Sequence, residues 1–220
     1  GAYNKELAER NGLNMSHIDW TKGYEPDNKL RISQMKQITN MCIITDDSSE
    51  RTFKYLAVSS DEYPVIYLYN SQRQNIARLI SHTMGITSLF SYHNLLFSGS
   101  KDCQAKLWNI YKGTTCVCFE YHYSSITAMV CGNYLGKDVL FTAGTNNLVI
   151  CWSISDNKSL FSIQLGRNLL PTKLMFLPDS ENKTAALIVS SIVVDNDDDK
   201  DEFATLNDIH NGCQIQTFVF

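Results

Sequence analysis

The side chains best suited to chemistry in this sequence are five histidines, seven cysteines and one acidic run. Catalysis by such groups needs a nucleophile beside its base, a metal cluster or a phosphate-binding loop, and each arrangement has a recognisable spacing. The motifs GxSxG, HExxH, GxxxxGK[ST] and GxGxxG do not occur. The histidines are scattered along the chain, at His17, His82, His93, His122 and His210. We therefore expect a protein that is not an enzyme and that uses no cofactor or metal ion.

The acidic run at 195–202, DNDDDKDE, is the segment most similar to a cation-binding loop. Its first, third and fifth residues are aspartates, as in the calcium loop of an EF-hand. Lys200 stands where that loop needs a glycine, and Leu206 stands where it needs a bidentate glutamate. We therefore interpret the run as a solvated surface loop, which is also able to attract a basic partner.

The cysteine count and the charge restrict the class of protein further. Seven cysteines without a CxxC pair argue against a zinc site or a secreted disulfide framework. The net charge of −4 comes with no basic stripe, so direct binding to nucleic acid is not expected. No run approaches the roughly 20 apolar residues that span a bilayer. An intracellular protein of the cytoplasm or nucleus fits these features best.

The composition favours β-strands as the elements that carry these side chains. Eleven tyrosines, ten phenylalanines and three tryptophans accompany many valines, isoleucines and threonines. Aromatic and β-branched side chains pack well on the half-buried surface of a pleated sheet. We therefore predict an all-β fold, and 44% apolar residues suffice for a buried core.

Three segments of the chain repeat one another as a strand, a tight turn and a second strand. They read LAVSSDEYPVIYLYN at 56–70, LFSGSKDCQAKLWNI at 96–110 and LFTAGTNNLVICWSI at 140–154. The second and third superimpose without a gap, which matches Trp108 with Trp152. The first needs one extra residue, which places Tyr69 in the same slot. Internal similarity of this kind indicates a repeat architecture.

The surrounding sequence supplies two further strands to each repeat, so each unit is expected to be a four-stranded antiparallel sheet. In the last unit we expect AALIVSSIVV as the second strand, EFATLNDI as the third, and the residues after the Asn211-Gly212 turn as the fourth. A short helix or extension is expected at 1–17. The expected units cover residues 18–34 (a partial unit), 35–80, 81–120, 121–165 and 166–220.

A spacing of about 40 to 45 residues, with a histidine about 25 to 30 residues before a tryptophan, resembles the WD40 family. The likeness covers roughly 18–220 and is strongest at 80–154. It implies a β-propeller of which about five blades are visible, part of an incomplete seven-bladed ring. The WD dipeptide itself is absent, because Asn109 follows Trp108 and Ser153 follows Trp152.

The resemblance implies a buried hydrogen-bonded tetrad in each of two blades, with a structural role. The first tetrad would consist of His82, Ser98, Asp102 and Trp108. The second would consist of His122, Thr142, Asn146 and Trp152. A buried indole N–H needs an acceptor, and a carboxylate can orient the imidazole. Because an amide brings no charge, we expect the second tetrad to be the weaker.

A single blade cannot bury both of its faces, so blades must stack until a ring closes. Seven blades require roughly 280 to 315 residues, more than this chain provides. Three explanations stay open: the chain is a fragment of a longer protein, its structure omits segments of the protein, or the ring is left open and a partner's strand completes it by edge pairing.

The leading functional hypothesis is a non-enzymatic scaffold that binds peptides or domains of other proteins in a multi-subunit complex. The resemblance nominates Lys101 and Thr145, which precede the turn Asp and Asn, as binding residues, followed by Thr83 and Tyr123. A first alternative is a substrate receptor or regulatory subunit, of a ubiquitin ligase or a lipid-kinase assembly. A second alternative is a phosphoinositide-binding propeller, although the chain has no adjacent arginines.

Overall fold

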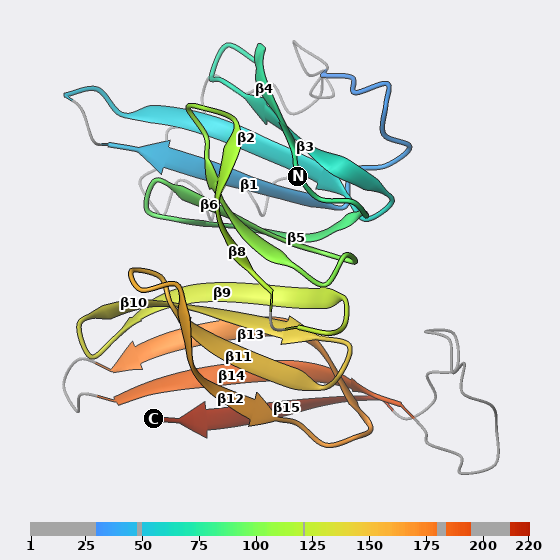
Figure 1. Cartoon of the computed structure of the whole chain (residues 1–220), viewed down its shortest axis with the longest axis vertical. Helices are drawn as coiled ribbons and strands as arrows, with labels where there is room; N and C mark the ends of the chain where they lie inside the picture. Colours follow the sequence, from blue (N-terminus) through green and yellow to red (C-terminus); the bar gives the residue numbers. More distant parts are fainter. Residues whose placement is uncertain (1–29, 48–49, 121, 180–183, 195–211) are drawn as a thin grey trace, which may run out of the picture. The chain divides into compact units, whose positions relative to one another are not determined.

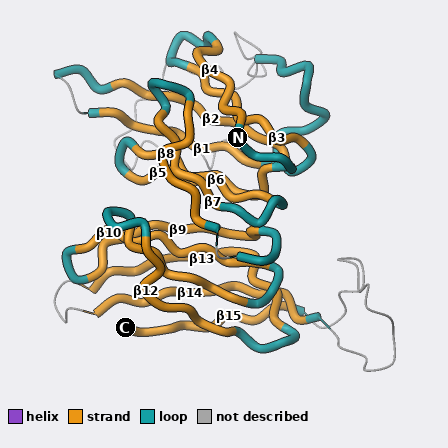
Figure 2. The backbone as a smooth tube through the Cα atoms, viewed as in Figure 1, coloured by secondary structure: helices purple, strands orange, loops and turns teal. Residues whose placement is uncertain are grey.

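The computed structural model describes residues 30–47, 50–120, 122–179, 184–194 and 212–220. The chain divides into two units, 1–33 and 34–220, and the strands of the described residues all belong to the second. Figure 2 shows that regular structure in the described residues is entirely β-strand. No helix able to cross a membrane is found in this part of the chain. The extension or helix expected at 1–17 lies outside the described residues.

The strands form four antiparallel sheets in chain order (Figure 1). Sheet 1 contains β1 (Asn40–Asp46), β2 (Phe53–Ser60), β3 (Tyr63–Tyr69) and β4 (Asn75–Ile80). Sheet 2 contains β5 (Ile86–Tyr92), β6 (Leu95–Ser100), β7 (Ala105–Asn109) and β8 (Thr114–Phe119). Sheet 3 contains β9 (Ile126–Tyr134), β10 (Lys137–Gly144), β11 (Leu148–Ser153) and β12 (Lys158–Gln164). Sheet 4 contains β13 (Leu169–Asp179), β14 (Thr184–Val193) and β15 (Cys213–Val219).

In the described residues the all-β prediction is confirmed, and three of the four antiparallel sheets have the expected four strands. Each of the three repeated segments is the hairpin of the second and third strands of its sheet. Equivalent residues face each other across these hairpins, in the pairs Leu56 with Tyr69, Leu96 with Trp108, and Leu140 with Trp152. The aromatic residue therefore has the same cross-strand partner in all three sheets.

The fourth strand of each complete sheet pairs with the third strand through a bulge. The bulge lies just before the aromatic slot each time, between Leu68 and Tyr69, Leu107 and Trp108, and Cys151 and Trp152. A bulge adds one residue to one strand and increases the local twist. The same bulge at the same position shows that the three sheets share one strand arrangement.

The sheets pack face to face, and their first strands lie next to one another. β1 contacts β5, β5 contacts β9, and β9 contacts β13 (Figure 1). Each pair of neighbouring sheets encloses an apolar cluster. Between sheets 3 and 4, for example, the fully buried ring of Phe141 stacks on Phe176 and Phe220. The core is thus a series of layers, and each layer is shared by two successive sheets.

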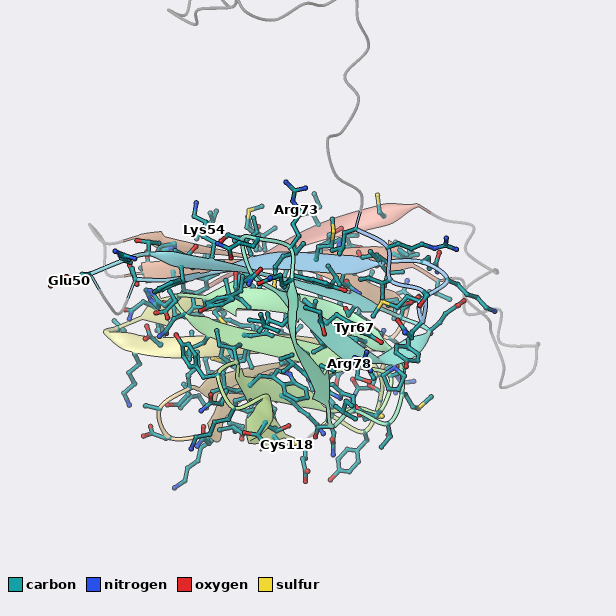
Figure 3. The ribbon with its side chains drawn as sticks, turned by 90° about the horizontal axis from the view of Figure 1, so that it is seen from above. Glu50, Lys54, Tyr67, Arg73, Arg78 and Cys118 are labelled. Atoms are coloured by element: carbon teal, nitrogen blue, oxygen red, sulfur yellow. The ribbon has the colours of Figure 1, made fainter. Side chains whose placement is uncertain are left out.

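One contact ties the outermost strand of sheet 1 to its neighbour. The guanidinium carbon of Arg78 on β4 lies 5.6 Å from the centre of the Tyr67 ring on β3 (Figure 3). Tyr67 and Arg78 are also cross-strand partners. A cation over an aromatic face contributes roughly 0.5–1 kcal/mol at an exposed site. The charge of Arg78 therefore stabilises the pairing of β3 and β4 through its contact with Tyr67.

Sheet 4 differs from the sequence prediction. β15 pairs directly with β14 and so occupies the third position, where we expected the strand EFATLNDI. That segment lies outside the described residues, as does the acidic run. The partial unit expected at 18–34 has no strand in its described part, 30–34. The described residues therefore form four sheets, whereas about five units were expected.

Candidate functional site

Four side chains of sheet 2 form a continuous hydrogen-bonded network. Ser98 Oγ lies 2.7 Å from His82 Nε2 and accepts the indole N–H of Trp108 at 2.7 Å. His82 Nδ1 lies 2.7 Å from Asp102 Oδ2. Since the indole can only donate, the Ser98 hydroxyl is free to donate to Nε2, and Nδ1–H donates to the carboxylate. All four predicted residues of this unit are therefore brought together.

Asp102 is the charged member of this network and accepts two further hydrogen bonds. The backbone N–H of Thr83 donates to Oδ2 and that of Gln104 donates to Oδ1, both at 3.1 Å. Burial raises the pKa of the Asp102 carboxyl, but the hydrogen bond from His82 and those from the two N–H groups outweigh it and lower the pKa. The carboxylate thus fixes both the imidazole and the β6–β7 turn.

Sheet 3 repeats half of this network. The Thr142 hydroxyl oxygen accepts the indole N–H of Trp152 at 2.8 Å and lies 2.7 Å from His122 Nε2. On the other side of the ring, neither His122 Nδ1 nor Asn146 Oδ1 has a hydrogen-bond partner. The structure thus brings His122, Thr142 and Trp152 together, but it leaves the expected bond to Asn146 unmade.

The turn around Asn146 is held differently from the turn around Asp102. In sheet 2, Ser100 Oγ accepts the backbone N–H of Asp102 at 3.1 Å. The equivalent residue in sheet 3 is Gly144, and Ser124 Oγ accepts the N–H of Asn146 instead, also at 3.1 Å. A Cβ on Gly144 would lie 2.7–2.8 Å from His122 Nδ1, Ser124 Oγ and Asn146 Oδ1. These polar atoms therefore pack against the glycine.

His122 is an uncharged histidine at neutral pH. Its side chain is 2% exposed, and burial lowers its pKa from 6.5 to about 4. The Thr142 carbonyl, 3.2 Å from Nε2, acts in the opposite direction, but more weakly. A neutral imidazole in an apolar layer is an arrangement that protonation destabilises.

We expect the free energy of unfolding to fall by about 3 kcal/mol between pH 7 and pH 4 on account of His122. The unfolded chain takes up a proton at its ordinary pKa of 6.5, whereas the folded chain stays neutral down to about 4. Stability is therefore complete above pH 6.5, is lost as pH falls through this window, and levels off below it. Urea titrations at several pH values measure the loss.

The matched control is Asn146→Asp, which supplies the carboxylate that sheet 2 has at Asp102. A carboxylate beside His122 favours the imidazolium and raises its folded pKa, so the acid loss should shrink. Equal losses in wild type and Asn146→Asp would show that His122 does not govern acid stability.

The turns at one end of the sheets form a continuous rim, which we define as 61–62, 83–85, 101–103, 123–125 and 145–147. Backbone hydrogen bonds of 3.0 Å join Lys101 N–H to the Gly85 carbonyl and Thr145 N–H to the Ser125 carbonyl. A Cβ at Gly85 would lie 1.8 Å from the carbonyl oxygen of Asp61. The approach of two backbones at Gly85 therefore requires glycine and links the first two sheets.

Every binding residue that we predicted from the sequence lies on this rim. Tyr123 is 90% exposed, the highest value among the large hydrophobic side chains described. Thr83 and Thr145 are exposed, and Lys101 is partly buried. Sequence reasoning missed Met84, which is 50% exposed beside Thr83. The available signal was that Met84 directly follows Thr83, which the resemblance had already nominated as a binding residue.

Sequence reasoning also missed Lys106, a charged residue inside sheet 2. It is 6% exposed, and its ammonium donates to the carbonyl and the hydroxyl of Ser81 at 2.9 and 2.8 Å. The equivalent residue of sheet 3 is Ile150, which is buried in the apolar layer. The alternation of a strand does not predict such a buried cation.

Two cysteines of sheets 2 and 3 are held as neutral thiols. Burial raises the pKa of the thiol of Cys118 to about 11 and that of Cys151 to about 12. The nucleophilic thiolate is thus disfavoured at both sites. Within the described ranges, no three His, Cys, Asp or Glu side chains are grouped to hold a metal ion.

Comparison with known proteins gives a likeness at the level of fold. No family model matches this chain, and no curated protein matches it. Among the solved structures that resemble it is a crystal structure of the computationally designed Ika8 protein. The two are 19% identical with a TM-score of 0.55, over 70% of this chain and 43% of the designed protein. The chain therefore spans less than half of the designed protein's length, and the likeness concerns the fold alone.

Proposed function

We propose that this chain is an arc of a WD40-type β-propeller and serves as a non-enzymatic scaffold that binds other proteins through the rim. Three observations support the propeller arc. The first strands are adjacent from sheet to sheet, the aromatic slots have equivalent pairs and bulges, and His networks recur in sheets 2 and 3.

The exposed side chain of Tyr123 is the observation that supports the rim as the binding surface. Tyrosines and methionines are enriched at protein interfaces, because they supply large contact areas. Tyr123 and Met84 follow the buried His122 and His82 closely, so the two networks hold their backbones in place. The rim thus presents apolar anchors, with Lys101 between them in the chain, on a rigid support.

The test is affinity purification of the tagged chain from cells of its source, followed by mass spectrometry. Tyr123→Ala combined with Met84→Ala should reduce recovery of the specific partners at least tenfold, since each anchor contributes about 1–2 kcal/mol. Lys101→Glu should reduce it as well, because reversal of a rim charge slows association.

The matched control is Leu135→Ala. Leu135 is 66% exposed but lies in the β9–β10 turn, at the opposite end of sheet 3. Partner recovery should be that of wild type in this variant. If the rim double variant retains every partner of the wild type, the proposed binding surface is wrong.

A further inference from the structure

Strand β15 has an outer edge with which no described strand pairs. Ala185 and Phe220 exchange backbone hydrogen bonds of 3.3 and 2.9 Å, and Val193 N–H donates to the Gly212 carbonyl at 3.1 Å. Bonded and non-bonded residues alternate along an antiparallel strand. The residues whose N–H and C=O groups point outward are therefore Cys213, Ile215, Thr217 and Val219.

The sequence of β15 does nothing to prevent pairing at this edge. Natural edge strands are usually protected by charged residues, prolines or bulges. β13, at the other edge of the sheet, carries Pro171, Lys173 and Pro178. β15 reads CQIQTFV and has neither charge nor proline. Such an uncharged segment of high β-propensity is the kind that adds to another strand.

We propose that two copies of this chain pair antiparallel through the outer edges of β15, so that their fourth sheets become one continuous sheet. β15 has the same exposure pattern as β12, which is the fourth strand of sheet 3. Both strands also follow a residue with positive φ, Asn157 at 56° and Gly212 at 90°. The β15 of a second copy therefore suits the position that β12 takes on β11.

The register of this pairing follows from the outward-pointing groups. A two-fold axis at Gln216 places Cys213 opposite Val219 of the second copy, and Ile215 opposite Thr217. All outward N–H and C=O groups of 213–219 are then satisfied on both copies. Ile215 and Val219, now 71% and 69% exposed, gain cross-strand neighbours. Because the strand is uncharged, the symmetric contact brings no like charges together.

The direct test is Val219→Cys in the full chain under mild oxidation. In the proposed register, residue 219 lies about 5.5 Å from Cys213 of the second copy, within the range of a disulfide. Within one copy the two residues are about 20 Å apart along the strand. We expect a covalent dimer on a non-reducing gel. Met175→Cys is the control. Met175 is 56% exposed but lies on β13, at the other edge of the sheet, so this variant should give no more dimer than wild type.

Sedimentation velocity of the unmodified chain, from low to high micromolar concentration, provides the second test. Wild type should shift from monomer to dimer. Thr217→Pro removes an outward N–H, and Ile215→Lys places a charge beside the axis, so both should stay monomeric with wild-type thermal midpoints. A wild type that is monomeric throughout, a dimer that persists in Ile215→Lys, or the lack of a Val219→Cys crosslink would overturn the proposal.

Discussion

Trp152→Ala is expected to lower the free energy of unfolding by about 3–5 kcal/mol. The indole is 1% exposed, and its ring centre lies 5.3 Å from that of Phe119 in the layer between sheets 2 and 3. Truncation removes these contacts and leaves a cavity between two sheets. It also removes the donor to Thr142, which is fully buried. Urea denaturation followed by circular dichroism measures the loss.

Trp152→Phe separates packing from hydrogen bonding at this site. The phenyl ring retains most of the apolar contact but has no N–H, so the cost should be about 1–2 kcal/mol. If Trp152→Ala unfolds at the wild-type urea midpoint, the indole is not part of the core between the two sheets.

Asp102→Ala is expected to cost about 3 kcal/mol, because a single carboxylate satisfies three donors. The His82 side chain is fully buried, and its Nδ1 would lose a partner at 2.7 Å. The N–H groups of Thr83 and Gln104 would lose theirs as well. Urea denaturation measures this loss. Because the β6–β7 turn loses the carboxylate that holds it, proteolysis at this turn should also become faster.

Asp102→Asn is the control, since it makes sheet 2 resemble sheet 3. The amide keeps one acceptor oxygen, so the cost should be about half that of alanine. Because the folded pKa of Asp102 lies below 3.8, its charge stabilises above that value and the benefit disappears as pH falls further. Wild type and Asp102→Asn should therefore converge in strong acid. A constant difference down to the lowest pH would exclude a charge effect.

The repeated hairpins were predictable because local signals specify them. A tight turn between two apolar alternating runs fixes strand, turn and strand, and a one-residue slip would turn the apolar face outward. The pairing of β15 with β14 was not predictable, since it joins segments separated by a long insertion. Likewise nothing near Gly85 indicates that its backbone meets Asp61, because that contact depends on how two sheets approach.

Those residues of the candidate site were predictable that are identified by their type and their spacing along the chain. The spacing of His82, Asp102 and Trp108 identified a network that the structure assembles. His122 Nδ1 and Asn146 Oδ1 both pack against Gly144 without a hydrogen-bond partner, an outcome that residue types along the chain do not predict. The buried ammonium of Lys106 depends on the carbonyl of Ser81, a backbone group that a sequence does not place.

The three complete sheets share one bulge on the fourth strand, although the loop that leads to this strand varies in length. The chain runs six residues on from Tyr69 to its partner Asn75, but seven from Trp108 to Thr115 and seven from Trp152 to Ser159. The one-residue bulge on the fourth strand is present at either length, and beyond it Ala77, Val117 and Phe161 pair with equivalent residues of the third strand. These connections are therefore natural places for length variation among descendants of this gene, and for grafting a foreign peptide without disturbing the layers beneath.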